Sequence, residues 1–419
     1  MCSQFDEVID RKGTGSLKYD FAEERGKPAD VLPLWVADMD FRTCPTVMEA
    51  LEKSIKLGIF GYSECKKGYF EALRHWYLDY FDWEIRSEWL VKTPGVVFAI
   101  CTAIRALTRE GDAVMIQRPV YYPFSQSILN NNRKLVNNPL VYSDGKYSID
   151  FDDFEKKIVR NKVKLFLLCS PHNPVGRVWT AEELRRMGDI CTRHGALIVS
   201  DEIHADFTYA GYRHSVFASL KPEYRERTIT CTSPSKTFNL AGLQVSNILI
   251  ANPEIRRKFQ EEVCRTGYSQ LCGVGLAACQ AAYAGGRQWL EELKQYLAGN
   301  LSFLRSFLAD HIPRVRLVEP QGTYLVWLDF AGLGLSEKQL EELVVDHAKL
   351  WLDRGALFGE EGKSFERINI ACPRSTLQKA MNQLEKAIGN CRGGLKTGFD
   401  FPKDRISAQA HLPPACRLQ

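Results

Sequence analysis

The chain has 419 residues, too many for one ordinary domain, so we expect one large and one smaller hydrophobic core. Hydrophobic residues make up 45% and charged residues 25% of the chain, which is typical of a globular protein. The 55 Lys and Arg residues nearly balance the 51 Asp and Glu residues, giving a net charge of +4. Such a balance predicts no basic surface for nucleic acid.

The start of the chain and its cysteines indicate a cytoplasmic protein. Acidic side chains (Asp6, Glu7 and Asp10) stand where a secretory signal would have a basic start and an apolar run. No stretch reaches the ~20 apolar residues that span a bilayer, so no membrane partner is expected. The 13 cysteines have neither CxxC pairs nor metal-ligand spacing. They predict reduced thiols and no metal site.

In chain order, short aliphatic runs alternate with helical patterns up to about residue 285. The runs expected to form strands are 112–117, 163–169, 196–200, 228–232 and 245–251. Between the second and third runs, Thr180 and Glu183 can form a capping box, and Gly195 can end the helix that follows. Strand–helix–strand units of this length predict an α/β fold with a large, doubly wound, mostly parallel sheet.

The pattern changes after residue 285, which predicts a smaller α+β domain. A helical stretch (288–311) precedes the strand-like TYLVWLDF, and further helices are expected at 337–353 and 375–390. The predicted organisation is an N-terminal arm with part of the small domain (1–45), a large domain (46–285), a small domain (286–394) and a tail (395–419).

Four motifs follow the predicted strands: TPGVV, CSPHNPVG, SDEIHADF and TSPSKTFNLAGL. In a doubly wound sheet, ligands bind beyond the carboxyl ends of the strands, where these motifs would converge. Alone, a lysine such as Lys236 is more often a surface residue than a catalytic one, and Asp201 would serve equally well as a helix cap or as a cofactor ligand. Together they suit pyridoxal 5′-phosphate, which needs an amine to form an imine and a carboxylate to keep the pyridine nitrogen protonated.

Other polar groups at this edge could complete a cofactor site. Asn173 could donate to the phenolic oxygen of the cofactor, although Asn-Pro also makes plain turns. His204 could serve the same oxygen, or could have a local structural role. The groups that could bind the phosphate are the hydroxyls of Ser233 and Ser235 and the backbone N–H groups of Gly95, Val96 and Val97, if a helix begins there.

The motifs SPHNPVG, SDEIH and SKTFNLAGL together resemble those of the fold-type I pyridoxal-phosphate enzymes of the class I/II aminotransferase superfamily. The resemblance extends from about residue 5 to about residue 392. Within the superfamily, FDEVIDRKGTGSLKYD, LPLWVADMDF, FGYS and FERINIACPRS are similar to segments of the MalY/PatB-type cystathionine β-lyases. Gln244 stands where many aminotransferases of the superfamily have an arginine, which favours the lyase branch.

This resemblance implies roles for four more residues. Tyr121 would stack on the pyridine ring, and Tyr122 would line the substrate side, although tyrosines often serve only as core packing. Tyr62 would reach the phosphate of a neighbouring subunit, which implies a homodimer with shared active sites. Arg374 would bind the α-carboxylate of the amino-acid substrate, although a surface arginine near a helix start is an alternative.

The implied activity is that of a carbon–sulfur lyase. It would eliminate the thiol from L-cystathionine or a related S-substituted cysteine and leave pyruvate and ammonia. Two alternatives remain open: an aminotransferase of the same superfamily, and a regulatory role through protein binding. A nucleotide-binding α/β protein is disfavoured because the chain has no GxGxxG or P-loop motif.

Overall fold

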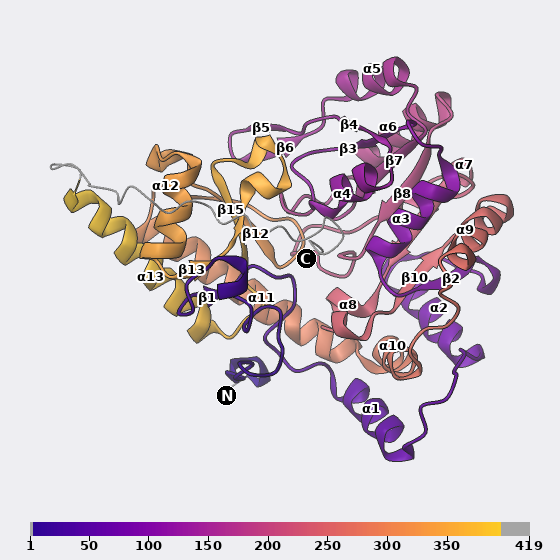
Figure 1. The fold of residues 1–419 in the computed structure, drawn as a ribbon, viewed down its shortest axis with the longest axis horizontal. Helices are drawn as coiled ribbons and strands as arrows, with labels where there is room; N and C mark the ends of the chain where they lie inside the picture. The colour runs from indigo at the N-terminus through magenta and orange to yellow at the C-terminus, as the bar shows by residue number, and fades with distance from the viewer. Residues whose placement is uncertain (1–2, 395–419) are drawn as a thin grey trace.

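The computed structural model describes residues 3–394 and is built around a seven-stranded sheet with the order β2-β10-β9-β8-β7-β3-β4 (Figure 1). Its strands are β2 (Leu90–Thr93), β3 (Ala113–Ile116), β4 (Lys134–Asn137), β7 (Leu165–Cys169), β8 (Leu197–Asp201), β9 (Thr228–Thr232) and β10 (Ser246–Leu249). The strands pair in parallel except β10, which is antiparallel to both of its neighbours. The doubly wound, mostly parallel sheet and all five predicted strands are therefore confirmed.

Helices cover both faces of this sheet because its strands are apolar on both sides. In β3, Val114 and Ile116 pack into one buried cluster while Ala113 and Met115 pack into another, as the period-2 alternation of a strand requires. The helices of this half are α3 (Val96–Leu107), α4 (Pro123–Asn130), α5 (Phe151–Asn161), α6 (Ala181–Arg193), α7 (Pro222–Arg225), α8 (Pro234–Thr237) and α9 (Pro253–Arg265). A small hairpin, β5 (Val141–Ser143) with β6 (Lys146–Ser148), lies between α4 and α5 along the chain.

The predicted start and stop signals of α6 are confirmed. The hydroxyl of Thr180 accepts a hydrogen bond from the N–H of Glu183, whose carboxylate accepts one from the N–H of Thr180. Just beyond the helix, Gly195 has a φ of 69°, a left-handed conformation that glycine adopts without strain.

A second, four-stranded antiparallel sheet has the order β11-β12-β15-β14. It comprises β11 (Arg316–Val318), β12 (Leu325–Asp329), β14 (Asp353–Arg354) and β15 (Phe365–Asn369), with α11 (Arg287–His311) and α13 (Arg374–Gly394) nearby. These elements agree with the α+β character expected for this part of the chain. The domain boundaries themselves stay a prediction, and the expected tail lies outside the described residues.

The single helix predicted for 337–353 is wrong. Helix α12 (Glu337–Glu341) continues as a π-helix (Glu342–His347), and two short strands, β13 (Leu350–Trp351) and β14, follow. Strand β13 pairs with β1 (Leu32–Pro33) near the N-terminus, and β14 pairs with β15. Strand β1 is remote from β13 in sequence, so this pairing overrides a local apolar pattern that suits a helix.

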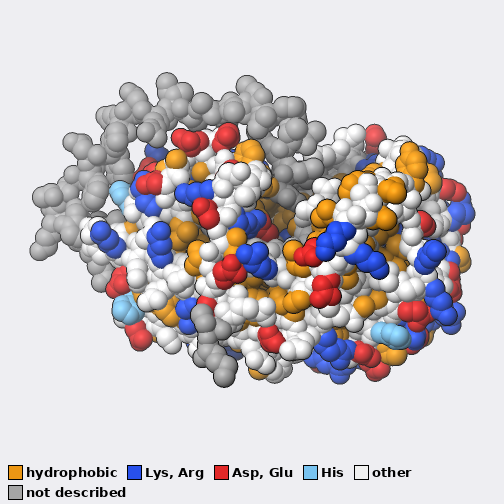
Figure 2. All heavy atoms as spheres, turned by 90° about the horizontal axis from the view of Figure 1, so that it is seen from below, with side chains coloured by type: hydrophobic (Ala, Val, Ile, Leu, Met, Phe, Trp, Pro, Cys, Tyr) orange, Lys and Arg blue, Asp and Glu red, His pale blue; other side chains and the backbone are white. Residues whose placement is uncertain are grey.

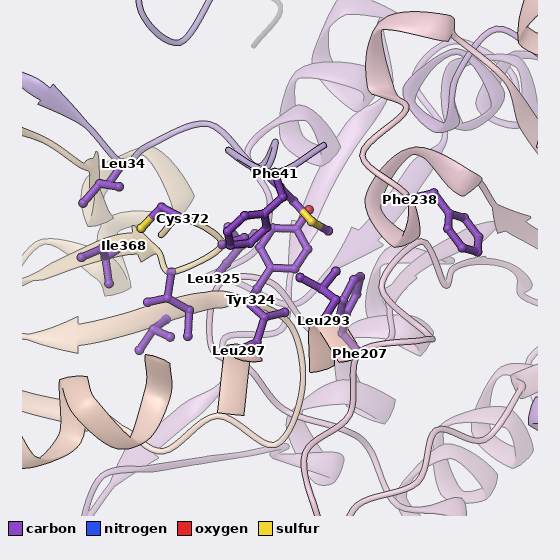
Figure 3. Packing of buried hydrophobic residues seen from close by; sticks show 14 of the residues in the cluster. Leu34, Phe41, Phe207, Phe238, Leu293, Leu297, Tyr324, Leu325, Ile368 and Cys372 are labelled. Atoms are coloured by element: carbon purple, nitrogen blue, oxygen red, sulfur yellow. The ribbon is translucent and has the colours of Figure 1, made fainter. Parts of the chain in front are cut away.

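The segment after β1 crosses from the small sheet to the large one. It leads to α1 (Pro45–Leu57) and α2 (Lys67–Phe81), and α1 and α2 both pack against α10 (Gly273–Gly285). Figure 3 shows Phe41 of the crossing segment close to Tyr324 and Leu325, and Leu34 near Ile368 and Cys372. The crossing segment is thus anchored by its apolar side chains.

Within residues 3–394, no helix is long and apolar enough to cross a membrane.

Candidate active site

Three neighbouring strands bring the predicted lysine, carboxylate and amide to one edge of the large sheet. Asp201 is the last residue of β8, where it pairs with Cys169 of β7 and Cys231 of β9. Lys236 lies in α8, directly after β9, and Asn173 lies just after β7. The parallel direction of β7, β8 and β9 is what places the three side chains together.

The amine of Lys236 donates a hydrogen bond to the carbonyl of Ala37, with 2.9 Å between the nitrogen and oxygen. Burial lowers the pKa of Lys236 to about 8; Asp38 and Asp201 oppose this effect, and Arg367 adds to it. With this pKa, about a tenth of the amine is unprotonated at pH 7, far more than for an ordinary lysine, and the unprotonated form is the one that acts as a base or nucleophile.

Asp201 is buried, and its carboxylate accepts a hydrogen bond from the backbone N–H of Ile203 at 3.2 Å. Burial raises the pKa of Asp201 to about 7, although this hydrogen bond and the charge of Lys236 act in the opposite direction. A cation placed against Asp201 would offset the free-energy cost of a buried negative charge and keep the carboxylate ionised.

His204 and Asn173 add hydrogen-bonding groups to the same edge. His204 is buried, and within the described chain its Nδ1 has no hydrogen-bond partner. Burial, assisted by the charges of Lys236 and Arg367, holds the pKa of His204 well below its ordinary value, so the ring is neutral. The backbone carbonyl of Asn173 accepts a hydrogen bond from the N–H of Tyr121. That bond brings the expected stacking tyrosine to the site.

The expected phosphate-binding groups have different surroundings. Helix α3 begins at Val96 with Gly95 as its N-cap, so the N–H groups of Gly95, Val96 and Val97 have no acceptor in a preceding turn. The hydroxyl of Ser233 lies 2.7 Å from the carbonyl oxygen of Val245 and 2.7 Å from the hydroxyl of Ser235. The hydroxyl of Ser233 is thus engaged both by Ser235 in its own turn and by the residue before β10, which leaves the hydroxyl of Ser235 the more available.

Arg374 does not join this group. It begins α13, where its Nε donates to the side-chain oxygen of Asn300 at 2.8 Å and its guanidinium lies over the ring of Phe303. These contacts hold its side chain against α11. The expectation that Arg374 binds the substrate carboxylate therefore has no support in this geometry.

A different arginine of the same motif, Arg367 on β15, lies at the site. It is 2% exposed, donates to Asn173 at 3.0 Å and to the carbonyl of Trp35 at 2.8 Å, and is paired with Asp353. Its buried Nε has no hydrogen-bond partner among the described residues. One signal in the sequence could have identified it: an arginine inside the strand-like run FERINIA must be buried, and buried arginines need a partner.

Tyr121 and Tyr122 lie beside each other, with ring centroids 5.3 Å apart, and the ring of Tyr122 also contacts Phe358. Tyr62 lies elsewhere: it is 96% exposed in the connection between α1 and α2. Within one chain, Tyr62 is therefore not brought to the other site residues.

Comparison with known proteins identifies the family. Residues 29–384 match the family model described as aminotransferase class I and II. The chain belongs to that family. It is 40% identical to cystathionine beta-lyase PatB of Bacillus subtilis (92% of this chain, 99% of PatB) and 34% identical to protein MalY of Escherichia coli (92% and 98%). The predicted superfamily and lyase branch are thereby confirmed.

Solved structures give the same result. Cystalysin from Treponema denticola, which contains pyridoxal 5′-phosphate, matches with a TM-score of 0.90 and 38% identity, covering 93% of this chain and all (100%) of its own. The pyridoxal-phosphate-bound C-S lyase from Staphylococcus hominis matches with a TM-score of 0.86 and 31% identity (93% and 98%).

Proposed function

We propose that this protein is a carbon–sulfur lyase that uses pyridoxal 5′-phosphate to eliminate a thiol from L-cystathionine or a related S-substituted cysteine. The observation that carries the proposal is the meeting of Lys236, Asp201 and Arg367 at one edge of the large sheet. The names of the curated relatives and the contents of the solved neighbours support the same activity.

The residues present fit the cofactor. A buried Asp201 with a raised pKa suits a protonated pyridine nitrogen, and the unpaired Nδ1 of His204 suits a polar group of the ring. Lys236 would hold the aldehyde, Asn173 and His204 would serve the phenolic oxygen, and Tyr121 would stack on the ring. The start of α3, with Ser233 and Ser235, would receive the phosphate. When bound, the cofactor supplies an electron-withdrawing ring that stabilises negative charge on the substrate Cα.

The protein's own groups then orient the substrate and move its protons. The free N–H groups of Arg367, rather than those of Arg374, would bind the substrate α-carboxylate. The amine of Lys236 would take the proton from Cα. Elimination suits sulfur because a thiol has a pKa of about 8.5, so a thiolate leaves far more readily than an alkoxide.

We further propose that the active protein is a homodimer in which Tyr62 of one subunit reaches the phosphate site of the other. Its exposure in one chain supports this arrangement. The cytoplasm is the proposed location, since the ten cysteines described are all free thiols, as expected in a reducing compartment.

The test is incubation of the purified protein with L-cystathionine in the absence of any keto acid. We expect equal amounts of pyruvate and free thiol. An aminotransferase would instead stop after one turnover with its cofactor aminated and no thiol released. Lys236→Ala should abolish the visible absorption band of the covalently held cofactor and lower turnover by ~10³-fold or more. Normal turnover in that variant would refute the proposal.

A further inference from the structure

The crossing segment (34–41) passes directly against Lys236. The carbonyl of Ala37 accepts one hydrogen bond from the amine of Lys236 at 2.9 Å and another from the hydroxyl of Tyr324 at 3.0 Å. One residue of this segment thus contacts both α8 of the large sheet and the residue that precedes β12 in the small one. The neighbour of Ala37 in the chain is Asp38, for which the proposed mechanism gives no role.

The backbone around Asp38 is held from both sides. The side-chain amide of Asn369 donates to the carbonyl of Val36 at 2.7 Å and to that of Asp38 at 2.6 Å. The side chain of Asn239 accepts from the N–H of Met39 at 2.9 Å and donates to its carbonyl at 3.0 Å. Asp38 therefore has little freedom to move relative to Lys236.

The carboxylate of Asp38 belongs to a network of four charges. Arg11 contacts Asp38 at 2.7 Å and Asp40 at 2.8 Å, and the fully buried Lys18 lies 2.8 Å from Asp40 and 3.6 Å from Asp38. Asp40 is thus within hydrogen-bond distance of both cations, whereas Oδ1 of Asp38 is buried and has no hydrogen-bond partner among the described residues. That oxygen retains capacity to interact with another positive group.

The charges that act on Lys236 come from three elements: Asp38 on the crossing segment, Arg367 on β15 and Asp201 on β8. Of the two carboxylates, Asp38 has the larger effect in raising the pKa of Lys236 against the lowering by burial. Asp38 also raises the pKa of Tyr324, the other group bound to Ala37, after the larger effect of burial. The negative charge of Asp38 thus acts on both groups that donate a hydrogen bond to Ala37, the amine of Lys236 and the hydroxyl of Tyr324.

We propose that Asp38 is a positioning residue for the reaction, a fixed countercharge that Arg11 and Lys18 hold beside Lys236. The inference rests on the proposed function. When the amine of Lys236 takes a proton from the substrate Cα, it becomes a cation, and the electron pair of the broken C–H bond stays with the substrate. A carboxylate already in place favours this transfer without any rearrangement. Asp201 does not replace Asp38, because its assigned partner is the pyridine nitrogen.

The test is a pH titration of the holoenzyme's visible absorption band, which changes with the protonation of the nitrogen that joins Lys236 to the cofactor. Asp38→Asn removes a negative charge and so should destabilise the protonated form. We expect the midpoint of the titration to move to lower pH by ~1 unit, a tenfold loss of proton affinity. Asp38→Glu should return it close to the wild-type value.

Asp40→Asn is the matched control, because Asp40 shares Arg11 and Lys18 with Asp38 but does not act on Lys236. Its midpoint should equal that of the wild type even if its melting temperature falls. Should it not fold, Asp20→Asn removes a carboxylate from the same N-terminal arm instead. If Asp38→Asn releases the cofactor, competitive acetylation of Lys236 across pH in the cofactor-free chain measures the proton affinity of its free amine, which should also be lower than in the wild type.

The countercharge role of Asp38 would be refuted if the titration midpoint of Asp38→Asn matched that of the wild type. It would also be refuted if the midpoint of Asp40→Asn moved by as much as that of Asp38→Asn. If the wild-type protein shows a visible band and releases thiol, the proposed function holds, and such a result would refute only the role of Asp38. A wild-type protein with neither property would refute both.

Discussion

Arg367 and Arg374 belong to one motif, yet their surroundings differ at the level of single contacts. The side chain of Arg367 is enclosed between Asn173, Asp353 and the carbonyl of Trp35, whereas Arg374 is engaged with Asn300 on α11. A planar guanidinium can bind a carboxylate through two parallel hydrogen bonds, and an ammonium cannot. Replacing each arginine by lysine therefore separates the role of shape from that of charge.

For Arg367→Lys we expect the KM for L-cystathionine to rise by ~10-fold or more, because the bidentate contact is lost while the charge is kept. Arg374→Lys should leave KM within ~3-fold of the wild type. Steady-state kinetics of both variants measure this difference. A larger effect at Arg374 would restore the assignment expected from sequence and remove Arg367 from the proposed mechanism.

At the scale of elements, strand β15 carries a buried acid next to its buried arginine. Glu366 is 2% exposed and opposes Arg354 of β14, and its Oε2 has no hydrogen-bond partner within the described residues. Burial, with the charge of Asp353 as a second cause, raises the pKa of Glu366 to about 8. In the folded protein, Glu366 therefore keeps its proton up to a higher pH than it does in the unfolded chain.

The sign of the pH dependence follows from this difference. Between an ordinary glutamate pKa of 4.5 and the folded value of about 8, the folded state binds more protons, so its stability falls as the pH rises. In Glu366→Gln this loss should be absent, so the variant should gain unfolding free energy relative to the wild type between pH 5 and 8, by ~2 kcal/mol or more. Urea unfolding at several pH values measures the gain.

Glu341 is a suitable control because its pH dependence has the opposite sign. Although burial opposes it, contacts with Lys27 and Arg354 hold the pKa of Glu341 below its ordinary value. Glu341→Gln should therefore be less stable than the wild type at neutral pH and should approach it on acidification. Parallel stability curves for Glu366→Gln and the wild type would show that Glu366 is ionised in the folded protein.

At the scale of the whole molecule, an apolar surface lies around the end of α1. Its exposed side chains are those of Met48, Ile55, Leu57, Ile59, Phe60 and Tyr62. Figure 2, which views the molecule from below, shows hydrophobic side chains exposed on the half that carries the large sheet. Grouped exposed apolar residues mark interaction surfaces, and a second subunit placed here would receive Tyr62.

Mixing two inactive variants tests the shared active site. In dimers of Lys236→Ala with Tyr62→Ala, one of the two sites has both native residues. After unfolding and refolding of an equal mixture, we expect about a quarter of wild-type activity, as random pairing of subunits predicts. Each variant refolded alone is the control. No gain in the mixture, with both variants dimeric and folded, would place Tyr62 outside the partner's site.

Local patterns in the sequence were sufficient for most elements and for the centre of the site. The capping box at Thr180, the helix start at Gly95 and the five aliphatic runs each depend on neighbours only a few residues away. Lys236, Asp201 and Asn173 could be grouped from sequence because parallel strands place their carboxyl ends at one edge. By contrast, β13 could not be predicted, because its partner β1 lies far away in the sequence.

The sequence by itself determined the α/β fold, the family and the lysine, carboxylate and amide of the site, since these depend on local periodicity and on motifs. Only the tertiary structure decided which arginine of FERINIACPRS lies with them and which charge stands beside Lys236. Arg367 contacts Asn173, and Ala37, the neighbour of Asp38, contacts Lys236; both contacts join segments about 200 residues apart. The burial and the neighbouring charges that set the pKa values of buried groups come from the packing of remote segments, and the spacing of residues along the sequence does not specify that packing.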